Sequence, residues 1–304
     1  MADDDARAQL ASILARESGA VAASAARMVE TRRLAGLEES LAAAFARILA
    51  LPAKRDPQCV AKRAIAHALV ELDIGHPAQH VYASGARHVQ LEPVFGGKVD
   101  TAAALRATCA LGLLITAPPT LWASLADLLC DPEPEARSGA IHAIARSGNP
   151  HVGVPLLRVR AGIRDPDGRV TADCLGALLA LDADGSIDFV AVRLRDEDPA
   201  VAEGAALALG ESRHPRALDR LRDFLSQPLD DDLLRAGYLS VMLLRSDAGR
   251  ELLLEEVRTA TAHRACLALE ALGHDATHLR DDVVRAAASR GEPDVRAALH
   301  ARFG

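Results

Sequence analysis

The residues best suited to bind another molecule gather in one stretch of this chain, between Ser84 and Arg106. Helical spacing of apolar residues stops there and resumes only at Asp100. Interruptions of this length inside a regular helical chain usually carry function. We therefore take an inserted loop at about 87–99 as the first candidate binding element, with these candidate residues in and beside it: Arg87, His88, Gln90, Glu92, Phe95, Lys98 and Arg106.

Two interpretations of this loop are open. Val89, Leu91 and Val94 suggest an extended segment, and Gly96-Gly97 suggests a tight turn. The loop could then be a finger that contacts a partner. It could also be an Ω-like loop whose Val, Leu and Phe95 side chains plug a gap in the protein. Helices at about 77–86 and 100–114 are expected to flank it, the second capped by Asp100 or the threonine after it.

Catalytic and metal-binding patterns are incomplete in this sequence. Lys98 follows a Gly pair, but Val99 replaces the Ser or Thr that a phosphate loop requires. Asp182 and Asp184 resemble part of a calcium loop that lacks the carboxylates at its first and twelfth positions. His76 precedes a proline and so lies outside the helix expected to hold the next histidine. We therefore predict no catalytic residues, no metal and no cofactor. These patterns favour a protein that is not an enzyme over one that is.

Composition indicates an all-α protein. Apolar residues make up 50% of the 304 and aromatic residues only 3%, and Ala and Leu, strong helix formers, dominate. The chain carries 32 Arg and 3 Lys, which we attribute to the coding bias of a GC-rich bacterial genome. Five scattered cysteines without a CxxC pair give no disulfide framework. Neither a signal peptide nor an apolar run long enough for a membrane span is evident, so we expect a cytoplasmic location and no membrane partner.

Charge makes nucleic acid an unfavourable partner. The net charge is −7, and residues 107–304 alone carry −8. Such a surface repels a phosphate backbone. A local basic patch in the first third of the chain is the one feature that favours a nucleic-acid alternative, and it would comprise Lys54, Arg55, Lys62, Arg63 and Arg106.

A repeat emerges when the helical segments are aligned. Asp-Pro followed by an Ala-rich helix begins at Asp56, Asp131, Asp165 and Asp198, and the last three lie 34 and 33 residues apart. Asp can cap the coming helix, and Pro fits its first turn. Shorter amphipathic partner helices are expected at 119–130, 151–162, 186–195, 215–226, 249–258 and 277–289. Three further helices, at 5–18, 20–34 and 37–51, precede the repeats.

This pattern resembles the HEAT repeat, in the short variety named after phycobilisome lyases. The resemblance implies a right-handed α-α superhelix, a solenoid of antiparallel helix pairs whose second helices line a concave face. It also implies an Arg near the start of each second helix. We find it at Arg137 and Arg235, whereas other units have Ala61, Thr171, Ala202 and Ala265, so the usual Asp–Arg stacking is not expected along the array. Arg137 and Arg235, with Lys62 and Arg63, complete the candidate binding residues.

Members of the family that this chain resembles are mostly scaffolds and adaptors. We therefore expect capping helices at 1–55, a repeat array at 56–304, and a scaffold that binds another protein through its concave face, the 87–99 loop, or both. The alternative is an enzyme accessory, either lyase-like or associated with nucleic acid. Partner identity, pathway and oligomeric state are not encoded in any recognisable motif.

Overall fold

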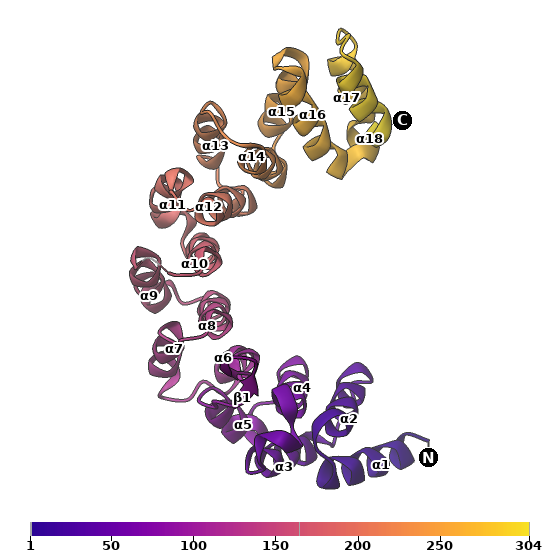
Figure 1. The fold of residues 1–304 in the computed structure, drawn as a ribbon, viewed down its shortest axis with the longest axis vertical. Helices are drawn as coiled ribbons and strands as arrows, with labels where there is room; N and C mark the ends of the chain where they lie inside the picture. The colour runs from indigo at the N-terminus through magenta and orange to yellow at the C-terminus, as the bar shows by residue number, and fades with distance from the viewer. Residues whose placement is uncertain (1, 164, 304) are drawn as a thin grey trace. The chain divides into compact units, whose positions relative to one another are not determined.

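The computed structural model describes residues 2–163 and 165–303, and these form antiparallel helix pairs and one small hairpin (Figure 1). The chain divides into two compact units, residues 1–152 and 153–304. The all-α solenoid expected from composition and repeat spacing is confirmed. Of the described residues, none lies in a helix that is both long enough and apolar enough to cross a membrane.

Unit 1 stacks its helices in two rows. Helices α2, α4, α6 and α8 pack side by side, and α3, α5 and α7 pack against this row. Short 3-10 turns at Ala53–Arg55, Pro57–Cys59 and His76–Ala78 connect them. The elements of this unit are α1 (Ala2–Arg16), α2 (Gly19–Thr31), α3 (Glu38–Leu49), α4 (Val60–Glu71), α5 (Gln79–Gly85), β1 (Leu91–Val94), β2 (Gly97–Asp100), α6 (Ala103–Thr116), α7 (Leu121–Leu129) and α8 (Pro134–Arg146).

Unit 2 repeats this arrangement after α9, which begins just before it. One row consists of α10, α12, α14, α16 and α18, and α11, α13, α15 and α17 pack against it. The bounds are α9 (Pro150–Gly162), α10 (Gly168–Leu181), α11 (Ala183–Val192), α12 (Pro199–Ser212), α13 (Ala217–Leu225), α14 (Asp231–Leu243), α15 (Asp247–Thr259), α16 (Ala262–Leu272), α17 (Ala276–Ala287) and α18 (Pro293–Phe303), with 3-10 turns at Arg193–Arg195 and Gly273–Asp275.

Small residues allow the helices of a row to approach closely. A Cβ placed on Gly139 of α8 would lie 2.4 Å from the Cα of Ala107 in α6, so a glycine is required at this crossing. The large buried side chains, such as Phe45, Tyr82 and Leu105, fill the space between the two rows. This division explains why Ala dominates one face of the second helices and larger side chains the other.

The aspartates that precede second helices align differently from the sequence prediction. Asp131, Asp165 and Asp196 each accept a hydrogen bond from the N–H two residues later. Asp198 instead caps α12 by accepting from Ala200 N. The structural equivalent of Asp131 and Asp165 is therefore Asp196, which is not followed by a proline.

The predicted helix start at Asp56 is also displaced. Gln58 and Cys59 have left-handed φ values of 56° and 52°, so α4 begins only at Val60. Asp56 still satisfies free N–H groups of this helix, because its carboxylate accepts from Ala61 N at 2.7 Å and from Lys62 N at 3.2 Å. The cap is the one expected, reached across a tight intervening turn.

Candidate functional site

The inserted loop is a two-stranded antiparallel hairpin. β1 and β2 pair in the register Leu91↔Asp100 to Val94↔Gly97, so that Phe95 and Gly96 alone form the turn. Gly96 has φ +88°, which the second central residue of a type II turn requires and which glycine adopts freely. The extended segment predicted from sequence is confirmed. The turn lies one residue earlier than expected, because Gly97 already belongs to β2.

The hairpin exposes its apolar side chains. Five of the eleven large apolar side chains that are exposed among the described residues lie between Val89 and Val99, and Phe95 at the tip is fully exposed (108%). The plug interpretation is therefore wrong, since none of these five side chains fills a gap. A short strand pair cannot bury both faces, and here the face turned to the helices is polar.

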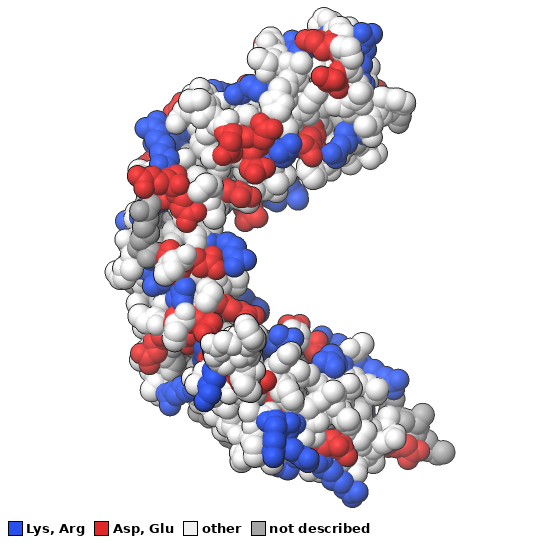
Figure 2. Space-filling model, in the orientation of Figure 1, with Lys and Arg blue, Asp and Glu red and all other residues white. Residues whose placement is uncertain are grey.

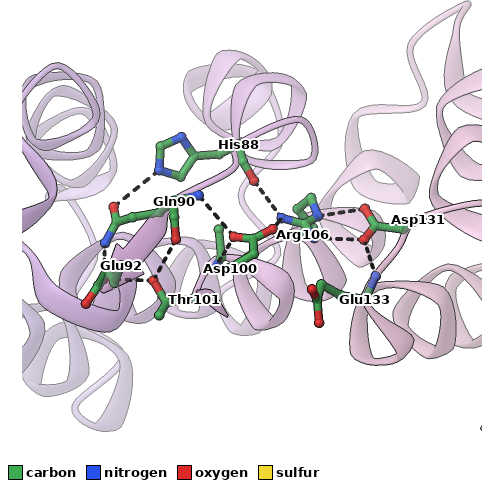
Figure 3. A network of polar contacts seen from close by, with 9 residues as sticks. His88, Gln90, Glu92, Asp100, Thr101, Arg106, Asp131 and Glu133 are labelled. Atoms are coloured by element: carbon green, nitrogen blue, oxygen red, sulfur yellow. Dashed lines mark hydrogen bonds and ion pairs between the residues drawn. The ribbon is translucent and has the colours of Figure 1, made fainter. Parts of the chain in front are cut away.

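Glu92 binds the inward face of the hairpin to the helices. Its Oε1 accepts hydrogen bonds from Gln90 Nε2 at 2.6 Å and from Thr101 Oγ1 at 2.8 Å (Figure 3). It also accepts from the backbone N–H of Gln58 at 2.6 Å. These donors, Gln90 foremost and then Thr101 and the Gln58 N–H, outweigh the effect of burial and lower the pKa of Glu92. Its Oε1 is therefore occupied within the protein.

Lys62 lies directly beneath the hairpin and is 1% exposed. Its Nζ donates to Gln90 Oε1 at 2.7 Å and forms an ion pair with Asp56 at 3.2 Å. Gln90 closes the cluster by donating through Nε2 to the Asp56 carbonyl at 2.9 Å. Removing one partner of a buried ion pair typically costs about 3–5 kcal/mol, so this cluster fixes the hairpin to α4.

Arg106 performs the same task on the other side of the hairpin. Its guanidinium donates in bidentate fashion to Asp131, with both distances 2.8 Å, and also to Asp100 at 2.7 Å and to the His88 carbonyl at 2.8 Å (Figure 3). Burial acts to lower the pKa of Arg106, but the bonds to the two aspartates outweigh it and raise this pKa. The hairpin is thereby joined to the loop that precedes α8.

Asp100 ends β2 and starts the approach to α6. Burial raises its pKa, but hydrogen bonds from the N–H groups of Gln90 and Ala102 and from Arg106 reverse the sign, so the pKa is lowered. The predicted capping role is present in altered form, since Asp100 bonds the Ala102 N–H at 3.0 Å while α6 begins at Ala103. The helix therefore starts three residues later than predicted.

The site contains no activated nucleophile or base. Burial is the main cause that raises the pKa of Cys59 to about 11, so its thiol remains protonated at neutral pH. Burial, followed by the charge of Lys62, lowers the pKa of His88, which favours the neutral ring. Within 2–163 and 165–303, no three His, Cys, Asp or Glu side chains are grouped to hold a metal ion. The arrangement can present a surface, and its polar groups serve to hold that surface in place.

Buried cations recur at one position of successive repeats. Lys62, Arg106 and Arg137 each lie six residues after an aspartate, namely Asp56, Asp100 and Asp131. Arg137 Nη1 donates to the carbonyls of Asp131 and Pro132, both at 2.8 Å. An Asp–Arg contact between neighbouring repeats, which the sequence did not lead us to expect along the array, therefore joins Arg106 to Asp131. The buried cation of the first repeat was missed because Ala61 was assigned to the position that Lys62 occupies, and the six-residue spacing was the available signal.

These contacts divide the candidate binding residues into an exposed group and a group that holds the hairpin in place. Arg87, Phe95 and Lys98 are exposed on or beside the hairpin, whereas His88, Gln90, Glu92, Lys62 and Arg106 hold it from within. Arg63 of α4 is exposed, and Arg235 of unit 2 lies 3.4 Å from both Asp232 and Glu270. The predicted basic patch does not form as a surface, because Lys62 and Arg106 are buried.

Each unit also has a groove along its row of second helices. In unit 1 it has a volume of about 520 Å³ and lies between α2, α4, α6 and α8, with Arg27, Arg63, Glu30 and Glu135 in its lining. In unit 2 a groove of about 350 Å³ lies between α12, α14 and α16, with Glu203, Asp232, Glu270 and Arg235 in its lining. The charged side chains therefore balance in the groove of unit 1, whereas carboxylates predominate in that of unit 2.

The stacked helix pairs define the chain as a helical-repeat protein of the solenoid class. The family model described as HEAT repeats matches residues 157–241, so this stretch of the chain is similar to HEAT repeats. This confirms the resemblance inferred from the Asp-Pro pattern. A comparison with curated proteins found no match.

Solved structures with a similar arrangement share little sequence with this chain. One is the complex of CpcE and CpcF of phycocyanin lyase from Nostoc sp. PCC7120, with 16% identity, a TM-score of 0.42, and coverage of 84% of this chain and 93% of that chain. Human deoxyhypusine hydroxylase in complex with glycerol has 20% identity, a TM-score of 0.35, and coverage of 88% and 96%. An engineered protein has 17% identity, a TM-score of 0.35, and coverage of 99% and 93%.

Proposed function

We propose that this chain is a scaffold that binds another protein and that the hairpin, residues 91–100, is its docking element together with Val89 beside it. The observation that carries the proposal is the hairpin itself: an apolar tip, exposed to solvent, on a base of buried and paired polar groups. Contiguous exposed apolar side chains on a soluble protein mark interaction sites. Aromatic residues such as Phe95 supply much of the binding energy when a partner covers them.

Rigid attachment strengthens this proposal. A loop that becomes ordered only on binding loses conformational entropy at that moment, which weakens the complex. Here the contacts of Lys62, Glu92 and Arg106 order the hairpin beforehand. Covering Phe95 alone would contribute about 1.5–3 kcal/mol to binding. We also propose that α1–α3, within residues 1–55, cap the repeat array that follows.

The test is a quantitative pull-down from the native host, comparing the wild type with V94S/F95S. Both side chains are exposed, so the double substitution leaves the fold intact. The matched control is V159S/V192S, which removes two exposed apolar side chains from unit 2. We expect a partner that the wild type and the control both recover and that V94S/F95S loses. Equal recovery by all three proteins would refute the role of the hairpin.

A further inference from the structure

We propose that the hairpin docks into a second copy of this chain, in the groove between α12, α14 and α16, with Lys98 facing Glu203. This inference rests on the proposed function, because it names the partner of the same docking element. It follows from the charges that each surface leaves unpaired and from the apolar side chains that accompany them.

Within the hairpin itself, the charged side chain that is exposed is that of Lys98. The carboxylates of Glu92 and Asp100 are turned toward donors within the protein. Lys98 and Arg87 are exposed and have no ion-pair partner among residues 2–163 and 165–303. Figure 2 shows uncharged surface where the hairpin lies. The complementary surface must therefore be apolar at its centre and acidic at its rim.

The groove of unit 2 has this composition. Leu207, Leu239 and Leu267 line it, and its volume of about 350 Å³ falls within the range of clefts that bind small ligands or side chains. Of its three carboxylates, Asp232 and Glu270 share Arg235, whereas Glu203 is exposed without an ion-pair partner in the described part of the chain. Acidic side chains gather over α14 (Figure 2).

The larger groove of unit 1 fits the hairpin less well. In its lining Arg27 and Arg63 are balanced by Glu30 and Glu135, so it offers an approaching Lys98 no net attraction. The groove of unit 2 has three carboxylates and one arginine, and complementary charge favours pairing with a lysine there. Charge therefore selects the groove of unit 2 over that of unit 1.

The proposed contact joins two different surfaces of the same chain. Such heterologous contacts do not saturate at a dimer unless the rotation between copies closes a ring. Association of the full chain should therefore continue past two copies as concentration rises. This behaviour separates the proposal from a symmetric contact between two hairpins, which would stop at a dimer.

The experiment is sedimentation equilibrium of the full chain over a wide concentration range. We expect the weight-average mass of the wild type to rise beyond that of a dimer. F95S should weaken association about 10- to 100-fold, because burial of Phe contributes about 1.5–3 kcal/mol. K98E and E203K should each weaken it about tenfold, and the double variant K98E/E203K should regain most of the loss, because the pair is again of opposite charge.

Three results would overturn the inference. A chain that stays monomeric at every concentration would remove the second copy as partner. A mass that levels at a dimer and does not respond to E203K would place hairpin against hairpin. A double variant no better than K98E would remove the pairing with Glu203. Each leaves the proposed function standing, which fails only if V94S/F95S recovers the same partner as the wild type in the pull-down.

Discussion

Replacing Arg106 with methionine tests how the hairpin is held. The guanidinium forms ion pairs with Asp100 and Asp131 and also bonds the His88 carbonyl. Methionine is of similar length and fills the same buried channel, so packing changes little. What changes is charge, because two carboxylates lose their only cation among these contacts.

The expected loss follows from these contacts. Removing one partner of a buried ion pair costs about 3–5 kcal/mol. Asp131 keeps a hydrogen bond from Glu133 N, and Asp100 keeps bonds from Gln90 N and Ala102 N, so the lower end applies. A loss of about 3 kcal/mol raises the unfolded fraction roughly 100-fold. It is a large share of the stability of an ordinary domain, about 5–15 kcal/mol.

Urea unfolding followed by far-UV circular dichroism measures this loss. The matched control is R87M, which removes an exposed Arg from the same segment and should change the free energy of unfolding by at most about 0.5 kcal/mol. If R106M lost less than about 1 kcal/mol, the buried network would not be what fixes the hairpin to unit 1.

Three further outcomes are expected. K62M should lower the free energy of unfolding by about 3 kcal/mol and R63M by at most about 0.5, because only Lys62 is buried and paired; urea unfolding would contradict this if both behaved alike. G139A should cost about 1–3 kcal/mol through overpacking, whereas G176A, with open space around it, should stabilise α10 by up to about 1 kcal/mol in thermal unfolding. Because the pKa of Asp100 is lowered by folding, its stabilisation is present at neutral pH and is lost as pH falls below about 4; urea titrations should show a steeper loss in the wild type than in R106M.

Much of the fold was predictable because local physics determines it. Three- and four-residue apolar spacing located nearly every helix, and Asp-Pro pairs indicated where second helices begin. A Gly-Gly pair between short apolar runs indicated the hairpin turn. These signals act over a few residues and need no knowledge of distant contacts.

What depended on distant contacts was not predictable. Whether Val94 and Phe95 are buried or exposed depends on which face of the hairpin meets the helices, so the sequence left both a plug and a finger open. Lys62 and Arg106 were taken as surface charges because lysine and arginine are seldom buried. Their aspartate partners, six residues before each, offered a signal that becomes clear only when the repeats are aligned in space. Left-handed residues such as Gln58 had no local signal.

Amide hydrogen exchange of the free chain tests the central claim most directly, namely that the hairpin is ordered before any partner arrives. Thr101 N–H donates to the Gln90 carbonyl at 2.9 Å, and the alternation of antiparallel bonds places Val99 in a bonded pair with Glu92 and points the Lys98 N–H outward. We expect slow exchange at Val99 and Thr101 and fast exchange at Lys98. Exchange at Val99 and Thr101 as fast as at Lys98 would show a loop without fixed structure and would contradict the account.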